Sequence, residues 1–236
     1  MGLLLMVLVL TAISPVPESS PRSELPVSGD NDTSVAKRIF MPVIIKMTGN
    51  APTKIYCMGD SLTSVDVYEP VLVDLLGPDW VTINKGISAQ YTEQMLARFQ
   101  HDIIDPGDAA YVIIWGGAID VRFGTPEETT KSNLQNMYTM AQNAGIKVVA
   151  VTITPQNDLS APNKAKILSI NSWIKNSAIN VDFIADAYTA VEDPSHPGNI
   201  LPAYDQGDHV HFSYLGYSAV ASTIYYAVLW IPYPPR

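Results

Sequence analysis

Cysteine, histidine and basic side chains are all scarce in this chain of 236 residues. Cys57 is the only cysteine, so neither an intrachain disulfide nor a zinc site built from several cysteines can form. The 14 Lys and Arg residues are outnumbered by 23 Asp and Glu residues, which gives a net charge of -9. The sequence contains no basic cluster, which argues against a nucleic acid or an anionic membrane as partner. Apolar residues make up 47% of the chain, enough for a packed globular domain.

The beginning of the chain differs in composition from the rest. The first 14 residues contain the run LLLMVLVLTAIS, which has the length of a signal-peptide core but lacks the usual basic residues before it. The residues that follow are rich in Pro, Ser and acidic side chains, which is typical of a flexible linker. We therefore expect a leader over 1–14, a linker over 15–50 and one folded domain over 51–236. A cleaved signal would make the protein secreted or part of the cell envelope, and a stray apolar start would leave it cytoplasmic.

Short Val/Ile-rich runs alternate with helical patterns through the predicted domain, as expected for a parallel sheet covered by helices on both faces. The expected strands are 54–58, 81–84, 110–115, 147–153 and 181–185. The expected helices are 64–76, 92–104, 126–144, 161–179 and 213–230. For the third helix, Thr125 is the expected N-cap, Pro126 the expected first residue and Gly145 the expected terminator.

The last predicted helix carries no charge, so a membrane span is the alternative for residues 213–230. Four tyrosines and several hydroxyl residues lie within it, and these favour a helix packed against the sheet. We expect no stable membrane span.

The segment MGDSLT follows the first predicted strand and contains Ser61. Ligands of parallel sheets gather beyond the carboxyl ends of the strands, which is where this serine is expected. Ser and Asp are also favoured helix caps, so the segment alone does not separate a nucleophile from a cap.

A serine nucleophile needs a base, and the base needs an orienting acid. The run DQGDHVHFS places Asp208 three residues before His211, in a loop that leads into the last predicted helix. Such a turn can bring the carboxylate to Nδ1 of the imidazole and leave Nε2 for the serine. His209 is the competing base, but it is adjacent to Asp208 and would point away from it in an extended loop.

With these residues in place, four blocks in order resemble those of the SGNH/GDSL hydrolases: MGDSLT, INKGISAQYTEQMLARF, VIIWGGAIDV and DHVHFSYLGYSAVA. The resemblance implies a flavodoxin-like three-layer α/β/α sandwich and hydrolysis of esters without a metal or other cofactor. It also implies that Ser61 is the nucleophile, His211 the base and Asp208 the residue that orients His211.

Two positions depart from the family pattern at the oxyanion hole, where the backbone N–H of Ser61 is one expected donor. Ala89 replaces the usual glycine, and its N–H can still donate if the backbone does not require a positive φ there. Ile119 replaces the usual asparagine and has no side-chain donor. Gln90 and Asn84 are the candidates to replace it.

Two aspartates, Asp60 and Asp120, are expected near the strand ends. Neither has a second carboxylate or histidine at metal-ligand spacing, so we expect them to support the loops through hydrogen bonds.

Three functions remain open at this point. The first is a serine esterase acting on small acyl esters, such as acetyl esters of carbohydrate. The second is a catalytically impaired or non-catalytic binding module on the same fold, which the residues at positions 89 and 119 favour. The third, a protein that binds phosphate or nucleotide, lacks a Gly-rich loop. The sequence does not predict the oligomeric state.

Overall fold

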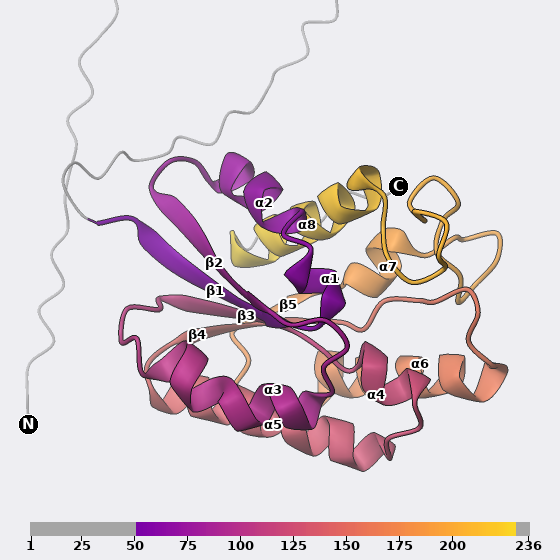
Figure 1. The fold of residues 1–236 in the computed structure, drawn as a ribbon, viewed down its shortest axis with the longest axis horizontal. Helices are drawn as coiled ribbons and strands as arrows, with labels where there is room; N and C mark the ends of the chain where they lie inside the picture. The colour runs from indigo at the N-terminus through magenta and orange to yellow at the C-terminus, as the bar shows by residue number, and fades with distance from the viewer. Residues whose placement is uncertain (1–50, 230–236) are drawn as a thin grey trace, which may run out of the picture. The chain divides into compact units, whose positions relative to one another are not determined.

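A computed structural model of the chain describes residues 51–229. The expected leader and linker, residues 1–50, lie outside this range, as do residues 230–236 of the expected domain. A five-stranded sheet forms the centre of the domain, with all strand pairs parallel and the order β2-β1-β3-β4-β5 (Figure 1). The strands are β1 Thr53–Gly59, β2 Trp80–Gly86, β3 Tyr111–Trp115, β4 Lys147–Val151 and β5 Phe183–Ala185. This order is that of a flavodoxin-like fold and confirms the predicted class.

Helices cover both faces of the sheet, and Figure 1 shows α2, α7 and α8 on one face and α3, α5 and α6 on the other. The long helices are α2 Tyr68–Leu76, α3 Thr92–Phe99, α5 Glu127–Asn143, α6 Ala161–Asn176 and α8 Tyr214–Val228. The short ones are α1 Ser61–Ser64, α4 Ala118–Arg122, α7 Ala187–Val191 and the π-helix η1 Gln100–Ile104, which continues α3. The middle strands are buried because helices lie on both sides of them, which explains their continuous apolar runs.

All five predicted strands and the long helices are present, with shifted ends. Three short helices, α1, α4 and α7, were not predicted, and the first predicted helix, 64–76, corresponds to α2, which starts later at Tyr68. The predicted cap of α5 is wrong: the helix begins at Glu127, and Pro126 rather than Thr125 is its N-cap. The carbonyl of Pro126 accepts the first N–H groups of the helix, while the N–H of Thr125 bonds back to Asp120.

The last helix, α8, has 15 residues and buries one side against the domain. Within residues 51–229, no helix combines the length and apolar character needed to cross a membrane.

Candidate active site

The turn after β1 is shaped by two glycines that let α1 lie directly on the strand ends. A Cβ on Gly59 would lie 2.1 Å from Oγ1 of Thr63, and one on Gly86 would lie 2.3 Å from the backbone nitrogen of Ser64. Real Cβ atoms do not approach other atoms so closely, so a side chain at either position would displace α1. The register pairs Gly59 with Gly86 on β2 and with Trp115 on β3, so the loops after all three strands start side by side.

Asp60, and not Ser61, caps the helix that follows β1. Asp60 is the N-cap of α1, and its Oδ1 accepts a hydrogen bond of 3.0 Å from the N–H of Leu62. Ser61 is the first helical residue, so its hydroxyl is not used for capping. Its Oγ lies 2.8 Å from Nε2 of His211.

The other nitrogen of His211 is held by a carboxylate. Nδ1 lies 2.6 Å from Oδ2 of Asp208, and the backbone N–H groups of Val210 and His211 donate to Oδ1 at 3.0 and 2.8 Å. The side chain of Gln206 adds a hydrogen bond of 3.0 Å to Oδ2. Partial burial raises the pKa of Asp208, but these donors outweigh it and hold the pKa well below the usual range. Asp208 is therefore a carboxylate at neutral pH, so His211 donates from Nδ1 and presents Nε2 to the serine.

The loop that carries this pair is anchored next to Ser61. Phe212 follows His211 directly, is buried, and stacks on Trp115 at the end of β3 with ring centroids 6.3 Å apart. The N–H of Ser213 bonds to the carbonyl of Tyr204 at 2.7 Å and closes the base of the loop. Packing and backbone bonds together fix the position of His211 over Ser61.

The competing histidine is engaged elsewhere. Nδ1 of His209 lies 3.0 Å from Oδ2 of Asp205, and no hydrogen bond joins His209 to Ser61. His196 pairs with Asp193 at 2.8 Å in the loop after α7. The structure therefore brings only His211 of the histidines in residues 51–229 into hydrogen-bonding contact with Ser61.

The loop after β2 takes a sharp turn at Ala89. Its φ is +61°, a left-handed conformation in which an L side chain is strained by roughly 1–2 kcal/mol. From the sequence, the Ala89 N–H is expected to donate only if no positive φ is required there, and the structure shows that a positive φ is present. The loop is fixed on both sides, by the N–H of Ile87 on the carbonyl of Gly59 at 3.1 Å and by a 2.9 Å contact between the hydroxyls of Ser64 and Ser88.

The third expected donor position, Ile119, lies on α4 and is half-buried. The N-cap of α4, Gly117, has a φ of +107°, so the chain turns tightly from β3 into the helix. Asn84, one candidate to replace the missing donor, is engaged under α1: its amide donates to the carbonyl of Thr63 at 2.7 Å and to Glu69 at 3.0 Å. The other candidate, Gln90, has its side-chain oxygen bound by Nε of Arg98 at 2.7 Å.

Asp120 joins two helices. Its oxygens accept hydrogen bonds from the backbone N–H and the hydroxyl of Thr92, at 2.9 and 2.7 Å, which ties α4 to the start of α3. Asp60 is also buried, and desolvation raises its pKa to about 6 although the N–H of Leu62 and the nearby His211 lower it. No group of three or more His, Cys, Asp or Glu side chains in residues 51–229 is arranged to hold a metal ion.

The sequence-based reasoning missed two features next to the site. Arg98 connects the loop after β2 to the nucleophile turn, because it also donates to the carbonyl of Gly59 at 3.3 Å. Nothing in the run MLARF indicates this, since the partners lie far away in sequence. The pairing of Asp205 with His209 was also missed, although their four-residue spacing next to Asp208 and His211 is a visible signal.

A serine hydrogen-bonded to a histidine–aspartate pair at the carboxyl ends of a parallel sheet is the arrangement of a serine hydrolase. The chain matches the model of the GDSL-like Lipase/Acylhydrolase family over residues 57–219, more than half of its length, and it belongs to that family. This membership supports hydrolysis of esters in general. A comparison with curated proteins finds no match.

Several solved structures are similar to this one. A candidate acylhydrolase from Bacteroides fragilis NCTC 9343 is 27% identical, with a TM-score of 0.65 over 75% of this chain and 87% of its own. A GDSL-like lipase from Bacteroides thetaiotaomicron VPI-5482 is 24% identical, with a TM-score of 0.63 over 75% and 88%. A variant of an acetyl xylan esterase from Geobacillus stearothermophilus is 18% identical, with a TM-score of 0.64 over 80% and 100%. The last two show the shared fold.

Proposed function

We propose that this protein is a serine esterase that hydrolyses small acyl esters through Ser61, His211 and Asp208. The observation that carries the proposal is the continuous chain of hydrogen bonds from Asp208 to His211 (2.6 Å) and from His211 to Ser61 (2.8 Å). The hydroxyl of Ser61 needs a base to become a nucleophile, and the base needs a partner that fixes its tautomer and stabilises its positive charge.

In the first half of the reaction, Oγ of Ser61 attacks the carbonyl carbon while Nε2 of His211 takes the hydroxyl proton. The carbonyl oxygen becomes an oxyanion, and the C–O bond to the alcohol then breaks as His211 gives its proton to the leaving oxygen. In the second half, water attacks the acyl-enzyme with His211 again as base, and the acid is released with Ser61 regenerated. Asp208 stays ionised throughout because its pKa is far below neutrality.

The oxyanion requires donors on the side of the site opposite His211. We assign this role to the backbone N–H groups of Ser61 and Ala89, because the φ of +61° strains Ala89 but leaves its N–H in place as a donor. The side chain of Ile119 contributes none, and removal of one such donor typically lowers kcat about 10²–10³-fold. The proposal therefore describes an esterase with full activation of the nucleophile and weaker stabilisation of the transition state.

The direct test is the hydrolysis of 4-nitrophenyl acetate by the purified protein, compared with the Ser61→Ala variant. We expect turnover by the wild type and loss of it in the variant. Undiminished activity in Ser61→Ala would rule out this mechanism.

The alternative is a non-catalytic binding module, and the apolar Ile119 together with the strained Ala89 favours it. That function predicts no turnover of any acyl ester. It also predicts that an organophosphonate, which labels activated serines, leaves Ser61 unmodified.

A further inference from the structure

The loop that carries Asp208 and His211 contains a second, interleaved Asp–His pair. His209 has a φ of +71°, in the left-handed region that side chains other than glycine rarely adopt. Such a conformation persists only where its surroundings enforce it, and it is found preferentially at functional sites. His209, directly after Asp208, therefore has a backbone conformation that glycine would adopt without strain.

Asp205 and Asn157 hold His209 in this conformation. The N–H of His209 donates to Oδ1 of Asp205 at 3.1 Å, and its Nδ1 lies 3.0 Å from Oδ2 of the same carboxylate. The N–H of Asn157, in the loop after β4, donates to the carbonyl of His209 at 3.0 Å. Both the backbone and one ring nitrogen of His209 are thus fixed, which leaves Nε2 as the polar atom of a side chain that is 56% exposed.

The surroundings of His209 are rich in hydrogen-bonding groups. Arg122 on α4 binds both oxygens of Asp158 at 2.9 and 2.7 Å, and these bonds hold the pKa of Asp158 below its usual range, with a smaller contribution from nearby His209. Asp158 follows Asn157 directly, and the N–H of Asn157 bonds to the carbonyl of His209, so Asp158 lies close to His209. The edge of the site from α4 to the loop with His211 therefore presents charged and polar atoms.

The mechanism determines which part of the substrate meets this edge. His211 must deliver its proton to the leaving oxygen, so the alcohol portion of the ester lies on the His211 side of Ser61. The oxyanion is held by the donors assigned above, the N–H groups of Ser61 and Ala89. His209 precedes His211 by two residues in the same loop, so we infer that it lies on the side of the alcohol.

We propose that His209 is a specificity-determining residue that binds a hydroxyl group of a polyhydroxylated leaving alcohol through Nε2. This inference rests on the proposed esterase function and adds the class of its alcohol, a carbohydrate or similar polyol. Asp205 holds the ring by accepting from Nδ1–H, which leaves the lone pair of Nε2 to accept a hydrogen bond from a substrate hydroxyl. The ordered ring requires little further ordering when the substrate binds, which strengthens the contact.

The test compares two acetates that differ only in the alcohol: 4-nitrophenyl acetate and a monoacetylated methyl β-xyloside with free hydroxyls. We would measure kcat and KM on both for the wild type and for His209→Gly, since glycine keeps the φ of +71° without strain. The expected result is a fall of about tenfold in the ratio of kcat/KM for the xyloside to kcat/KM for the aryl ester, the size of one lost hydrogen bond. His209→Asn also tolerates this φ and carries an amide, so it should restore part of the ratio.

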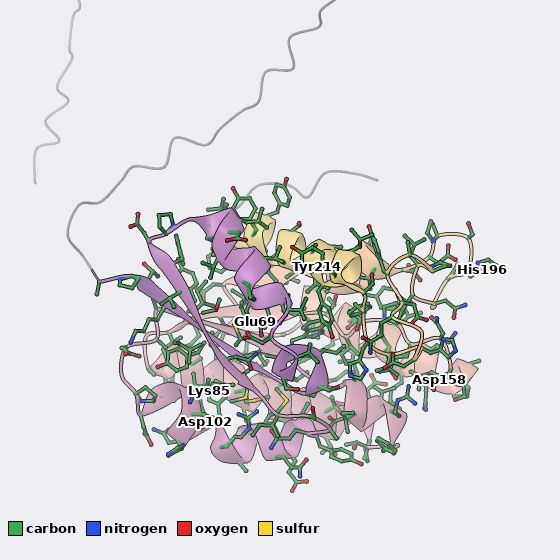
Figure 2. The ribbon with its side chains drawn as sticks, turned by 45° about the horizontal axis from the view of Figure 1, so that its top comes forward. Glu69, Lys85, Asp102, Asp158, His196 and Tyr214 are labelled. Atoms are coloured by element: carbon green, nitrogen blue, oxygen red, sulfur yellow. The ribbon has the colours of Figure 1, made fainter. Side chains whose placement is uncertain are left out.

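The matched control is His101→Ala. His101 is exposed and paired with an aspartate like His209, but it lies on η1, and Figure 2 shows its neighbour Asp102 well away from Asp158. This control should leave the ratio at the wild-type value.

An unchanged ratio in His209→Gly would overturn the inference, whether the rates on both acetates hold or fall together, because a purely structural role lowers both alike. A wild type that hydrolyses the aryl acetate but not the xyloside would also overturn it. Failure of the proposed esterase function has a different signature, namely no turnover of 4-nitrophenyl acetate by the wild type.

Discussion

The two sides of Ser61 are built very differently. On the His211 side, ionised Asp208 is bound by backbone and side-chain donors, and a buried aromatic ring anchors the loop. At the two other expected oxyanion positions, Ala89 occupies a strained conformation and Ile119 has an alkyl side chain without a donor. In the mechanism proposed above, activation of the nucleophile has its full set of groups, whereas stabilisation of the oxyanion lacks one donor.

The largest effect is expected on the His211 side, from Asp208→Asn. The amide has the same shape but cannot carry the charge that stabilises protonated His211, and it favours the wrong imidazole tautomer. We expect kcat on 4-nitrophenyl acetate to fall about 10³–10⁴-fold with little change in KM. The same substitution at Asp193, whose histidine partner does not contact Ser61, should leave kcat within about twofold. Equal losses from both substitutions would contradict the assignment.

The next largest effect should come from repair of the opposite side. Ile119→Asn supplies an amide at the third donor position, and we expect kcat to rise about 10-fold or more, within the 10²–10³ that one donor can contribute. Ile119→Leu changes the shape without adding a donor and should give no gain. If Asn and Leu behave alike, another group already fills this place or the loop is built differently.

The pKa values of the carboxyl groups extend the comparison. Asp208 and Asp205 have lowered pKa values. Burial raises the pKa of Glu69, which lies on α2 and accepts a hydrogen bond from Asn84, to about 8. Between pH 4.5 and 8 the unfolded chain releases this proton while the folded protein keeps it. The stability that protonated Glu69 contributes is therefore fully present below pH 4.5 and is lost as pH rises through 8.

Substitution of this carboxyl by an amide should remove that pH dependence. We expect Glu69→Gln to stabilise the protein at pH 9 by on the order of 1–3 kcal/mol and to have little effect at pH 4, as measured by urea denaturation at both values. The variant retains an oxygen for Asn84, so its packing is preserved. Parallel stability profiles for the two proteins would show that Glu69 ionises normally in the fold.

The smallest effect is expected from relief of strain at Ala89. Ala89→Gly removes the left-handed strain but gives the unfolded chain more freedom, so the net gain in unfolding free energy should be about 0.5 kcal/mol. Ala97→Gly on the exposed side of α3 provides the control, because glycine within a helix costs about 1 kcal/mol. Thermal unfolding should therefore shift in opposite directions for the two variants. Destabilisation by both would show that Ala89 is not strained.

The sequence predicted the fold well because the buried strands and the spacing of their helices are local patterns. The five strands appear close to their expected positions, and the proximity of Ser61 to Asp208 and His211 follows from the block order. The conformations of single residues could not be predicted in this way. Ala89 and His209 both take positive φ values that depend on distant partners, and the cap of α5 differs by one residue because Thr125 bonds back to α4.

The most direct test of the account is the reaction of the full chain with a fluorophosphonate, followed by mass spectrometry of the intact protein and its peptides. The account predicts one adduct per wild-type chain, located on Ser61, and a rate of labelling at least about 10³-fold lower in His211→Ala, since the serine then lacks its base. No adduct in the wild type, or equal labelling of the wild type and His211→Ala, would contradict it.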